Sequence, residues 1–233
     1  VEVVEAHAEG LLEHPHYTRP AEFRGEGVPD GSKSLTFALR FRALDRTLTA
    51  APEYRDAGGF LQATRNGEAS LTNAIKVALQ RIPARHVADL FCGIGSFTFA
   101  LALGGDRRNV VAVESDPRAV RSLQYAVGQS SSPIKVVERD LFRRPLDKAD
   151  LSGLDLVLFD PPRAGALAQC ENLAIDGPEW VIAVSCNPAT FSRDIRVLRN
   201  GGYELTRVVP VDQFLWSSHL EMFAILHRNK TSA

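Results

Sequence analysis

The sequence predicts an α/β fold built on a doubly wound, mostly parallel sheet. Five short apolar segments have the length of buried strands, and they lie at 86–91, 109–114, 134–140, 155–160 and 180–186. Segments typical of helices alternate with them, at 71–82, 96–105, 117–127 and 188–202. This alternation is typical of parallel βαβ units. Two further strands have no long helix between them, which predicts a terminal antiparallel hairpin on the edge of a seven-stranded sheet, at 203–212 and 219–228.

The part of the chain before this pattern has a different composition. Residues 1–34 are polar, contain three of the six histidines and predict an arm or linker without its own core. Residues 35–66 form a β-rich connecting segment, because apolar and polar side chains alternate from Leu35 to Phe41. We therefore expect the α/β domain to occupy residues 67–233.

Composition limits the classes of protein that the chain can belong to. It has 233 residues, 27 Lys and Arg against 28 Asp and Glu, a net charge of −1 and 45% hydrophobic residues. This length can bury a full core, and no apolar run approaches the roughly 18–20 residues that span a membrane. With no signal peptide and only three cysteines, at 92, 170 and 186, we expect a reduced, cytoplasmic protein. The near-neutral charge gives no global sign of nucleic-acid binding.

Unusual residues follow the predicted strands at their carboxyl ends, where ligands bind in open α/β sheets. Asp89 ends the first strand, and Gly93 and Gly95 after it would let the backbone approach a ligand closely. Thr98 stands where a dinucleotide-binding motif needs its third glycine, which disfavours NAD.

Two further acids follow the next strands. Glu114 is placed to accept hydrogen bonds from ribose hydroxyls, and Asp140 could contact an adenine. One such acid is often a solvated loop residue, but acids after three successive strands favour a binding site. This pattern resembles the S-adenosylmethionine pocket of class I methyltransferases.

The fourth and fifth strands end in the segments DPPRAG, at 160–165, and SCNPATF, at 185–191. The two prolines give a rigid, extended turn, which would also be their role in a purely structural loop. A free cysteine is usually a small buried hydrophobe, and we assign that role to Cys92 and Cys170. Cys186 differs because it immediately precedes a helix, whose N-terminal dipole can favour the thiolate.

In the last hairpin, His219 and Glu221 are two residues apart and face the same way in a strand. A metal site would need a third ligand at suitable spacing, and the sequence offers none. We therefore expect no metal and no iron–sulfur cluster in this chain.

Taken together, FLQAT, DLFCGIGSF, DPPRAG, SCNPATF and DQFLWSSHLE resemble the RNA 5-methyluridine methyltransferase family over about residues 55–228. The family methylates C5 of uridine in tRNA or ribosomal RNA with S-adenosylmethionine, on a Rossmann-like sheet. The resemblance implies a set of cofactor-binding residues, namely Gln62, Phe91, Gly93, Gly95, Ser96, Glu114, Asp140 and Asp160. It also implies that Cys186 is the nucleophile that attacks C6 and Glu221 the base that removes the C5 proton.

The substrate would be a flipped or looped nucleotide in RNA, and we expect the protein to be a monomer. Phe214 and Trp216 are candidates for stacking on the base, with core packing as an equal alternative. Three arginines are candidates for contacts with phosphate groups, namely Arg163, Arg193 and Arg196. The alternative is that they are solvated helix residues.

The sequence departs from the family pattern at several positions. Ser96 replaces an asparagine, Ala183 replaces a tyrosine, and Leu215-Trp216 stands where proline followed by glutamine or histidine is usual. The last change leaves another pyrimidine or a small molecule open as the substrate. The family's N-terminal RNA-binding β-barrel and four-cysteine cluster site are also absent from the sequence, so a weakly active RNA-binding module is a further alternative.

A second resemblance lies in the N-terminal arm. The segment GLLEHPHYTRPAEFRGEGVP is similar to a stretch of tRNA guanine-N1 methyltransferases. The match covers only about thirty residues and lacks that family's knotted cofactor site, so we do not transfer its activity.

Overall fold

The computed structural model describes residues 21–23, 34–36, 65–103, 107–211 and 220–229. The chain divides into two compact units, of which one comprises residues 1–49 with 215–217 and the other residues 50–214 with 218–233. In the first unit, β1 (Ala21–Phe23) pairs antiparallel with β2 (Ser34–Thr36).

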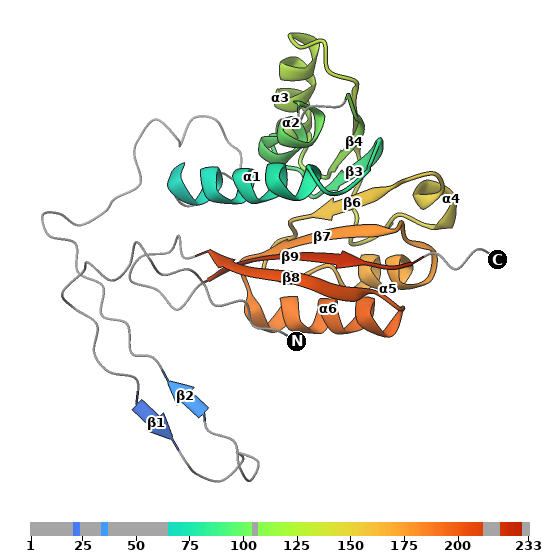
Figure 1. The fold of residues 1–233 in the computed structure, drawn as a ribbon. Helices are drawn as coiled ribbons and strands as arrows, with labels where there is room; N and C mark the ends of the chain where they lie inside the picture. The colour runs from blue at the N-terminus through green and yellow to red at the C-terminus, as the bar shows by residue number, and fades with distance from the viewer. Residues whose placement is uncertain (1–20, 24–33, 37–64, 104–106, 212–219, 230–233) are drawn as a thin grey trace, which may run out of the picture. The chain divides into compact units, whose positions relative to one another are not determined.

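The second unit contains a seven-stranded sheet in the order β5-β4-β3-β6-β7-β9-β8 (Figure 1). Strands β3, β4, β5, β6 and β7 of this sheet are parallel to one another. Strand β9 lies between β7 and β8 and is antiparallel to both, so β8 forms one edge of the sheet. The strands are β3 (His86–Leu90), β4 (Asn109–Glu114), β5 (Ile134–Glu138), β6 (Leu156–Phe159), β7 (Trp180–Ser185), β8 (Glu204–Val211) and β9 (Glu221–His227).

This sheet confirms the predicted fold class, including the terminal antiparallel hairpin. The helices are α1 (Arg65–Leu79), α2 (Ser96–Leu103), α3 (Pro117–Gly128), α4 (Lys148–Leu151), α5 (Leu167–Asp176) and α6 (Pro188–Asn200). Helices α4 and α5 lie in a part of the chain where the sequence pattern predicted no helix. Helices α1 and α2 pack on one face of the sheet, and α5 and α6 pack on the other (Figure 1).

Both faces of the central strands are apolar because both are covered by helices. In β6, Leu156 and Leu158 pack with α1 and α2, while Val157 and Phe159 pack with α5 and α6. Successive side chains of a strand point to opposite faces, so a four-residue apolar run serves both halves of the core.

Two helices begin at the carboxyl end of the sheet with a side-chain cap. The Asp116 carboxylate accepts the Arg118 N–H at the start of α3, and the Asn187 amide oxygen accepts the Ala189 N–H at the start of α6. In each case a proline follows the cap as the first helical residue, where its missing N–H costs nothing. Because α6 begins directly after β7, Cys186 lies in a short, well-defined connection.

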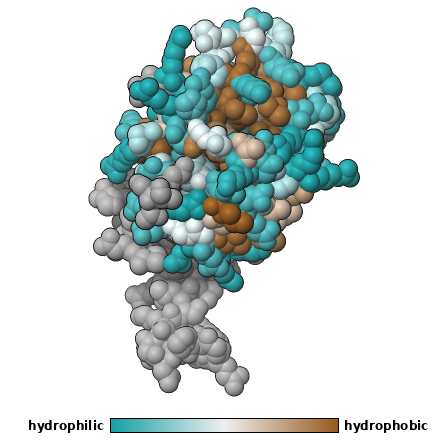
Figure 2. All heavy atoms as spheres, turned by 90° about the vertical axis from the view of Figure 1, so that its right-hand side faces the viewer, coloured by the Kyte–Doolittle hydropathy of each residue, from teal (hydrophilic) through white to brown (hydrophobic). Residues whose placement is uncertain are grey.

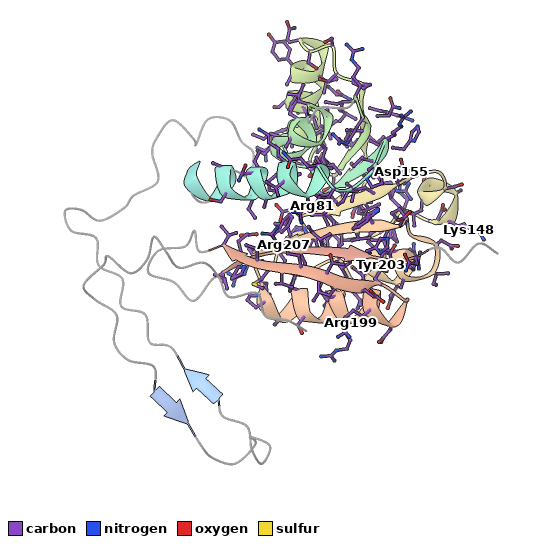
Figure 3. All side chains as sticks on the ribbon, in the orientation of Figure 1. Arg81, Lys148, Asp155, Arg199, Tyr203 and Arg207 are labelled. Carbon is purple, nitrogen blue, oxygen red and sulfur yellow. The ribbon has the colours of Figure 1, made fainter. Side chains whose placement is uncertain are left out.

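The opposite end of the sheet is closed by polar contacts. The Asp155 carboxylate, labelled in Figure 3, accepts the N–H groups of Arg85 and His86, both at 2.8 Å. The Tyr203 hydroxyl donates to the Pro178 carbonyl, and the Arg228 guanidinium lies 4.5 Å from the centre of the Tyr203 ring. These contacts join strand ends to helix ends at the end of the sheet opposite the carboxyl ends of the parallel strands.

The face of the molecule in Figure 2 carries apolar areas between hydrophilic side chains. Six large apolar side chains of the described residues are exposed, namely Leu103, Tyr125, Phe142, Leu167, Ile175 and Val208. Of these six, Phe142 also lines the cavity described below. No helix within the described ranges is long and apolar enough to cross a membrane.

Candidate active site

A cavity of about 330 Å³ lies at the carboxyl ends of the parallel strands. Its walls come from the connections that follow β3, β4, β6 and β7, from the loop after β5 and from the first residue of β9. The lining residues are Phe91, Cys92, Gly93, Ile94, Ser96, Phe97, Glu114, Ser115, Phe142, Asp160, Pro161, Pro162, Arg163, Cys186 and Glu221. The cavity therefore contains both residues for which we expect catalytic roles and five of those expected to bind a cofactor.

The connection after β3 has an unusual backbone. Phe91 has φ 59°, a left-handed conformation that is rare for a residue with a side chain, and Gly93 has φ 55°. The turn aims the Gly93 N–H at the Glu114 carboxylate, which accepts it at 2.9 Å. Gly95 does not line the cavity, because it packs on α3, where a Cβ would overlap the Leu123 side chain.

The Glu114 carboxylate is held in place by its neighbours. One oxygen, Oε2, accepts the Gly93 N–H, and the other, Oε1, accepts the N–H groups of Ser115 at 2.6 Å and Asp116 at 2.9 Å. The Ser115 hydroxyl lies 3.1 Å from the same oxygen. A carboxylate has about four acceptor positions, so this group is oriented and Oε2 retains capacity for a ligand hydroxyl.

Asp140 is a turn-capping residue, and its contact with an adenine stays a prediction. Its Oδ1 accepts the N–H groups of Phe142 at 2.9 Å and Arg143 at 3.2 Å, so it caps the turn after β5 and does not line the cavity. The capped turn brings Phe142 to the cavity wall, with its ring centre 5.4 Å from that of Phe91. Phe142 is 52% exposed and was missed by the sequence analysis, which considered only the polar side chain of this turn.

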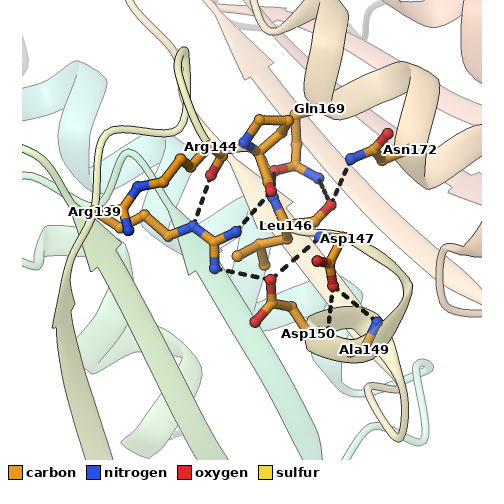
Figure 4. Close-up of polar contacts among 9 residues, drawn as sticks. Arg139, Arg144, Leu146, Asp147, Ala149, Asp150, Gln169 and Asn172 are labelled. Atoms are coloured by element: carbon orange, nitrogen blue, oxygen red, sulfur yellow. Dashed lines mark hydrogen bonds and ion pairs between the residues drawn. The ribbon is translucent and has the colours of Figure 1, made fainter.

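A polar network fixes the loop that carries Phe142 (Figure 4). Arg139 donates to the carbonyls of Arg144 and Pro145 and to the Asp150 carboxylate, at 2.6–2.8 Å. Gln169 of α5, 1% exposed, accepts the Leu146 N–H at 2.7 Å and donates to the Leu146 carbonyl. A buried amide with both of its polar atoms bonded holds the loop against α5.

The segments DPPRAG and SCNPATF are bonded to each other. The side-chain amide of Asn187 donates to the Arg163 carbonyl at 3.0 Å, and the Thr190 hydroxyl donates to the same oxygen at 3.2 Å. The polar residues after β7 therefore hold the loop after β6. The guanidinium of Arg193 bonds to Asp194 and to the Ala164 carbonyl, so its contacts are with this loop and not those expected of a phosphate ligand.

Cys186 and Glu221 line the same cavity from neighbouring strands, β7 and β9. Glu221 is 2% exposed, whereas Cys186 is half-buried. Burial raises the pKa of the Cys186 thiol, and the negative charges of Glu221 and Asp160 raise it further, against a lowering by its own backbone and by Arg163. The helix N-terminus was expected to favour the thiolate, but burial and the two carboxylates raise the pKa of the thiol by more than its own backbone and Arg163 lower it.

The other two cysteines differ from each other. Cys170 is fully buried in the core, as expected of a small hydrophobe. Cys92 is only half-buried and lines the cavity, so its assignment to the core was wrong. Burial, together with the charges of Asp89 and Glu114, raises the pKa of the Cys92 thiol far above its usual value, which makes it an inert thiol.

Asp89 lies beneath the connection after β3 and is 1% exposed. The Thr98 hydroxyl donates to its Oδ2 at 2.6 Å, while Oδ1 has no hydrogen-bond partner among the described residues. Burial raises the pKa of Asp89 to about 7, with the Thr98 hydrogen bond opposing and Glu114 adding to this shift.

Three residues of the expected site lie outside the described residues, namely Gln62, Phe214 and Trp216. Among the residues that the structure describes, no group of three or more His, Cys, Asp and Glu could hold a metal ion.

Comparison with known proteins identifies the family. The family described as tRNA (uracil-5-)-methyltransferase matches residues 54–229, three quarters of the chain. The chain belongs to this family. The match covers the α/β domain and all of the segments FLQAT, DLFCGIGSF, DPPRAG, SCNPATF and DQFLWSSHLE.

Curated relatives of this tRNA (uracil-5-)-methyltransferase family member match 72–74% of its length. A protein of Agrobacterium fabrum named as an RNA methyltransferase is 46% identical over 174 residues, 74% of this chain and 41% of the relative. The 23S rRNA (uracil(1939)-C(5))-methyltransferase RlmD of Alteromonas mediterranea is 36% identical over 171 residues, 72% of this chain and 35% of the relative. The chain thus spans about two fifths of the length of the curated relatives that it matches.

A solved structure supports the fold. The tRNA (uracil-54, C5)-methyltransferase of Pyrococcus abyssi, in complex with S-adenosyl-L-homocysteine, matches with a TM-score of 0.63 and 23% identity. The match covers 90% of this chain and 44% of that protein.

Proposed function

We propose that this protein transfers a methyl group from S-adenosylmethionine to C5 of a uridine in tRNA or ribosomal RNA, through a covalent bond between Cys186 and C6. The observation that carries the proposal is that Cys186, Glu221 and Asp160 line one cavity together with the Gly93 loop and Glu114. A thiol and a carboxylate at one end of a cavity, with a glycine loop at the other, are the groups that this two-substrate reaction needs.

The residues present fit the cofactor. Glu114 is oriented by three N–H donors and has room for a ribose hydroxyl, while Gly93 places no side chain between the backbone and a ligand. Phe91 and Phe142 offer apolar ring surface for the adenine, and Asp160 lies beside Cys186 at the methyl-donor end. When bound, S-adenosylmethionine supplies the electrophilic methyl group of a sulfonium.

The thiol activates the base. C5 of uracil is a poor nucleophile, so the thiolate of Cys186, after loss of its proton to solvent, adds to C6. The electron pair of the C5–C6 double bond moves onto C5 and the neighbouring carbonyl. C5 then takes the methyl group as the bond between that methyl and the donor sulfur breaks, and the electron pair of that bond stays on the sulfur. Burial and the charges of Glu221 and Asp160 raise the pKa of the thiol, and the Arg163 charge at the cavity wall favours the thiolate.

The carboxylate completes the reaction. Glu221 accepts the C5 proton, and the electron pair of that C–H bond restores the C5–C6 double bond as the sulfur–C6 bond breaks. The base must leave its stack to reach both groups. We propose Arg163, at the cavity wall, as a contact to the RNA, together with Phe214 and Trp216 as stacking partners.

Turnover on unmodified transcripts tests the proposal. The protein is incubated with methyl-labelled S-adenosylmethionine and with transcribed tRNA and ribosomal RNA, and the labelled nucleoside is identified after digestion. We expect 5-methyluridine. Label in 5-methylcytidine would replace uridine as the substrate, and label transferred to neither RNA by a protein that binds the cofactor would refute RNA methylation.

A further inference from the structure

Side chains from the N-cap and the first two turns of α6 bond to the backbone of the loop after β6. We call these four residues the α6 clamp: Asn187, Thr190, Arg193 and Asp194. The Asn187 side chain donates to the Arg163 carbonyl at 3.0 Å. The Thr190 hydroxyl lies 3.2 Å from the same oxygen and 3.2 Å from the Asn187 carbonyl, so its one proton is shared between the two acceptors. Arg193 donates to the carbonyl of the next residue, Ala164, at 3.0 Å.

Asp194 is the anchor of the α6 clamp. It is 2% exposed, and its Oδ2 accepts the Ala166 N–H at 2.7 Å. Its Oδ1 accepts two donors of the Arg193 guanidinium, at 2.9 and 2.7 Å, so both of its oxygens are used. A buried carboxylate that is paired and hydrogen-bonded in this way is costly to disturb, because removing one partner leaves an uncompensated charge.

Gly165 shows how closely the α6 clamp packs on the loop. Its φ is 76°, and a Cβ there would lie 2.5 Å from the Arg193 guanidinium and 2.6 Å from the Asp194 carboxylate. The loop after β6 therefore has one position against α6, fixed by four side chains.

The loop after β6 and the start of α6, which the α6 clamp joins, both adjoin the cavity. The loop carries Asp160 and Arg163, and α6 begins directly after Cys186. The start of the loop is tied to the sheet, since the Asp160 N–H donates to the Leu90 carbonyl. The α6 clamp thus holds the part of the loop around Arg163, together with the bond from the Gly165 N–H to the Pro162 carbonyl.

We propose that the α6 clamp is a positioning device that sets Arg163 against the Cys186 thiol, with Thr190 and Asp194 as positioning residues for thiol activation. This inference deepens the proposed function and rests on it for the RNA reaction only. The Arg163 charge lowers the pKa of the Cys186 thiol against the burial and the carboxylates that raise it. A loop that loses its bond to α6 lets that charge move away from the sulfur, which makes the thiolate rarer.

Thr190 offers a matched pair of variants, because its side chain is only half-buried. Thr190→Val keeps the shape and removes the hydroxyl that bonds the Arg163 carbonyl, whereas Thr190→Ser keeps the hydroxyl. Asp194→Asn keeps an oxygen for the Ala166 N–H and removes the charge that pairs with Arg193. Glu171→Gln removes an exposed carboxylate from α5 and is the control for loss of charge.

The first readout needs no RNA. The intact protein is alkylated with iodoacetamide from pH 6 to pH 10, and tandem mass spectrometry separates Cys186 from Cys170, which lies in the same tryptic peptide. We expect Thr190→Val and Asp194→Asn to slow Cys186 alkylation about threefold at pH 8, because a higher thiol pKa leaves less thiolate at that pH. Thr190→Ser and Glu171→Gln should match the wild type.

The second readout is the rate of covalent adduct formation with RNA that contains 5-fluorouridine. We expect Thr190→Val to slow it about 10-fold relative to Thr190→Ser, while S-adenosylmethionine affinity stays unchanged. Equal alkylation profiles for Thr190→Val and the wild type would overturn the positioning role, and so would a Thr190→Ser variant as slow as Thr190→Val. A wild type that forms no adduct would refute the proposed function, and the alkylation profiles would still decide the role of the α6 clamp.

Discussion

The two ends of the cavity are built in different ways. At the glycine-loop end, after β3 and β4, backbone N–H groups and a strained turn at Phe91 hold the Glu114 carboxylate. At the thiol end, after β6 and β7, side chains of a helix hold a backbone loop. At the first end one carboxylate side chain accepts backbone N–H groups, whereas at the second end side chains donate to the carbonyls of a loop 24 to 29 residues earlier in the chain. Substitutions at the two ends should therefore change different properties of the protein.

Asp89, which lies beneath the glycine loop, should make the stability of the protein depend on pH. Its pKa is raised from 3.8 to about 7 by burial, so the folded protein keeps a proton that the unfolded chain loses. The stabilisation is complete below pH 4 and is lost as the pH rises through 7, a change of about 4 kcal/mol at most. Denaturant unfolding at several pH values should show this fall for the wild type. Asp89→Asn should flatten it, and an unchanged slope would contradict the assignment.

Gly165→Ala should be the most damaging of the glycine substitutions at the thiol end. The positive φ and the overlap with Arg193 and Asp194 together should lower the free energy of unfolding by about 3 kcal/mol. Gly153 is the matched control, since it has φ 80° and no atom of the described residues lies within 4 Å of the place that a Cβ would take. Gly153→Ala should cost only the strain of the positive φ, about 1 kcal/mol. Equal losses for the two variants in chemical denaturation would show that packing on α6 is unimportant.

Glu114→Ala should weaken S-adenosylmethionine binding without affecting the thiol end. Loss of hydrogen bonds to a charged acceptor costs about 2 kcal/mol, and calorimetry measures it directly. Alkylation of Cys186 should stay at the wild-type rate. Unchanged cofactor affinity would remove Glu114 from the binding site.

Phe142→Ala should weaken cofactor binding by about 1 kcal/mol, the usual worth of a ring contact beyond its buried area. Phe142→Tyr, which keeps the ring, should bind as the wild type does. Val208→Ala on β8, an exposed apolar side chain remote from the cavity lining, is the control. A Phe142→Ala variant with wild-type calorimetric affinity would show that the ring takes no part in binding.

The sequence predicts the glycine-loop end better than the thiol end, for physical reasons. Alternating strands and helices and the strand-end residues are local patterns, so the parallel strands and Glu114 could be placed in advance. Helix α5 was missed because its start has no side-chain cap of its own, and Asp194 of α6 accepts the Ala166 N–H there instead. The raised pKa of Cys186 depends on burial and then on Glu221, a residue 35 positions later, and an argument from the local helix dipole includes neither.

Covalent trapping with RNA tests the central claim, that Cys186 and Glu221 act on opposite sides of methyl transfer. The variants Cys186→Ala and Glu221→Gln are incubated with S-adenosylmethionine and uridine-containing RNA, and denaturing gel electrophoresis separates free protein from protein bonded to RNA. Glu221→Gln should accumulate the bonded form, because its thiol adds to C6 while the C5 proton stays in place. Cys186→Ala should give none, because the nucleophile is gone. A bonded form in Cys186→Ala, or methylation by that variant at the wild-type rate, would contradict the account.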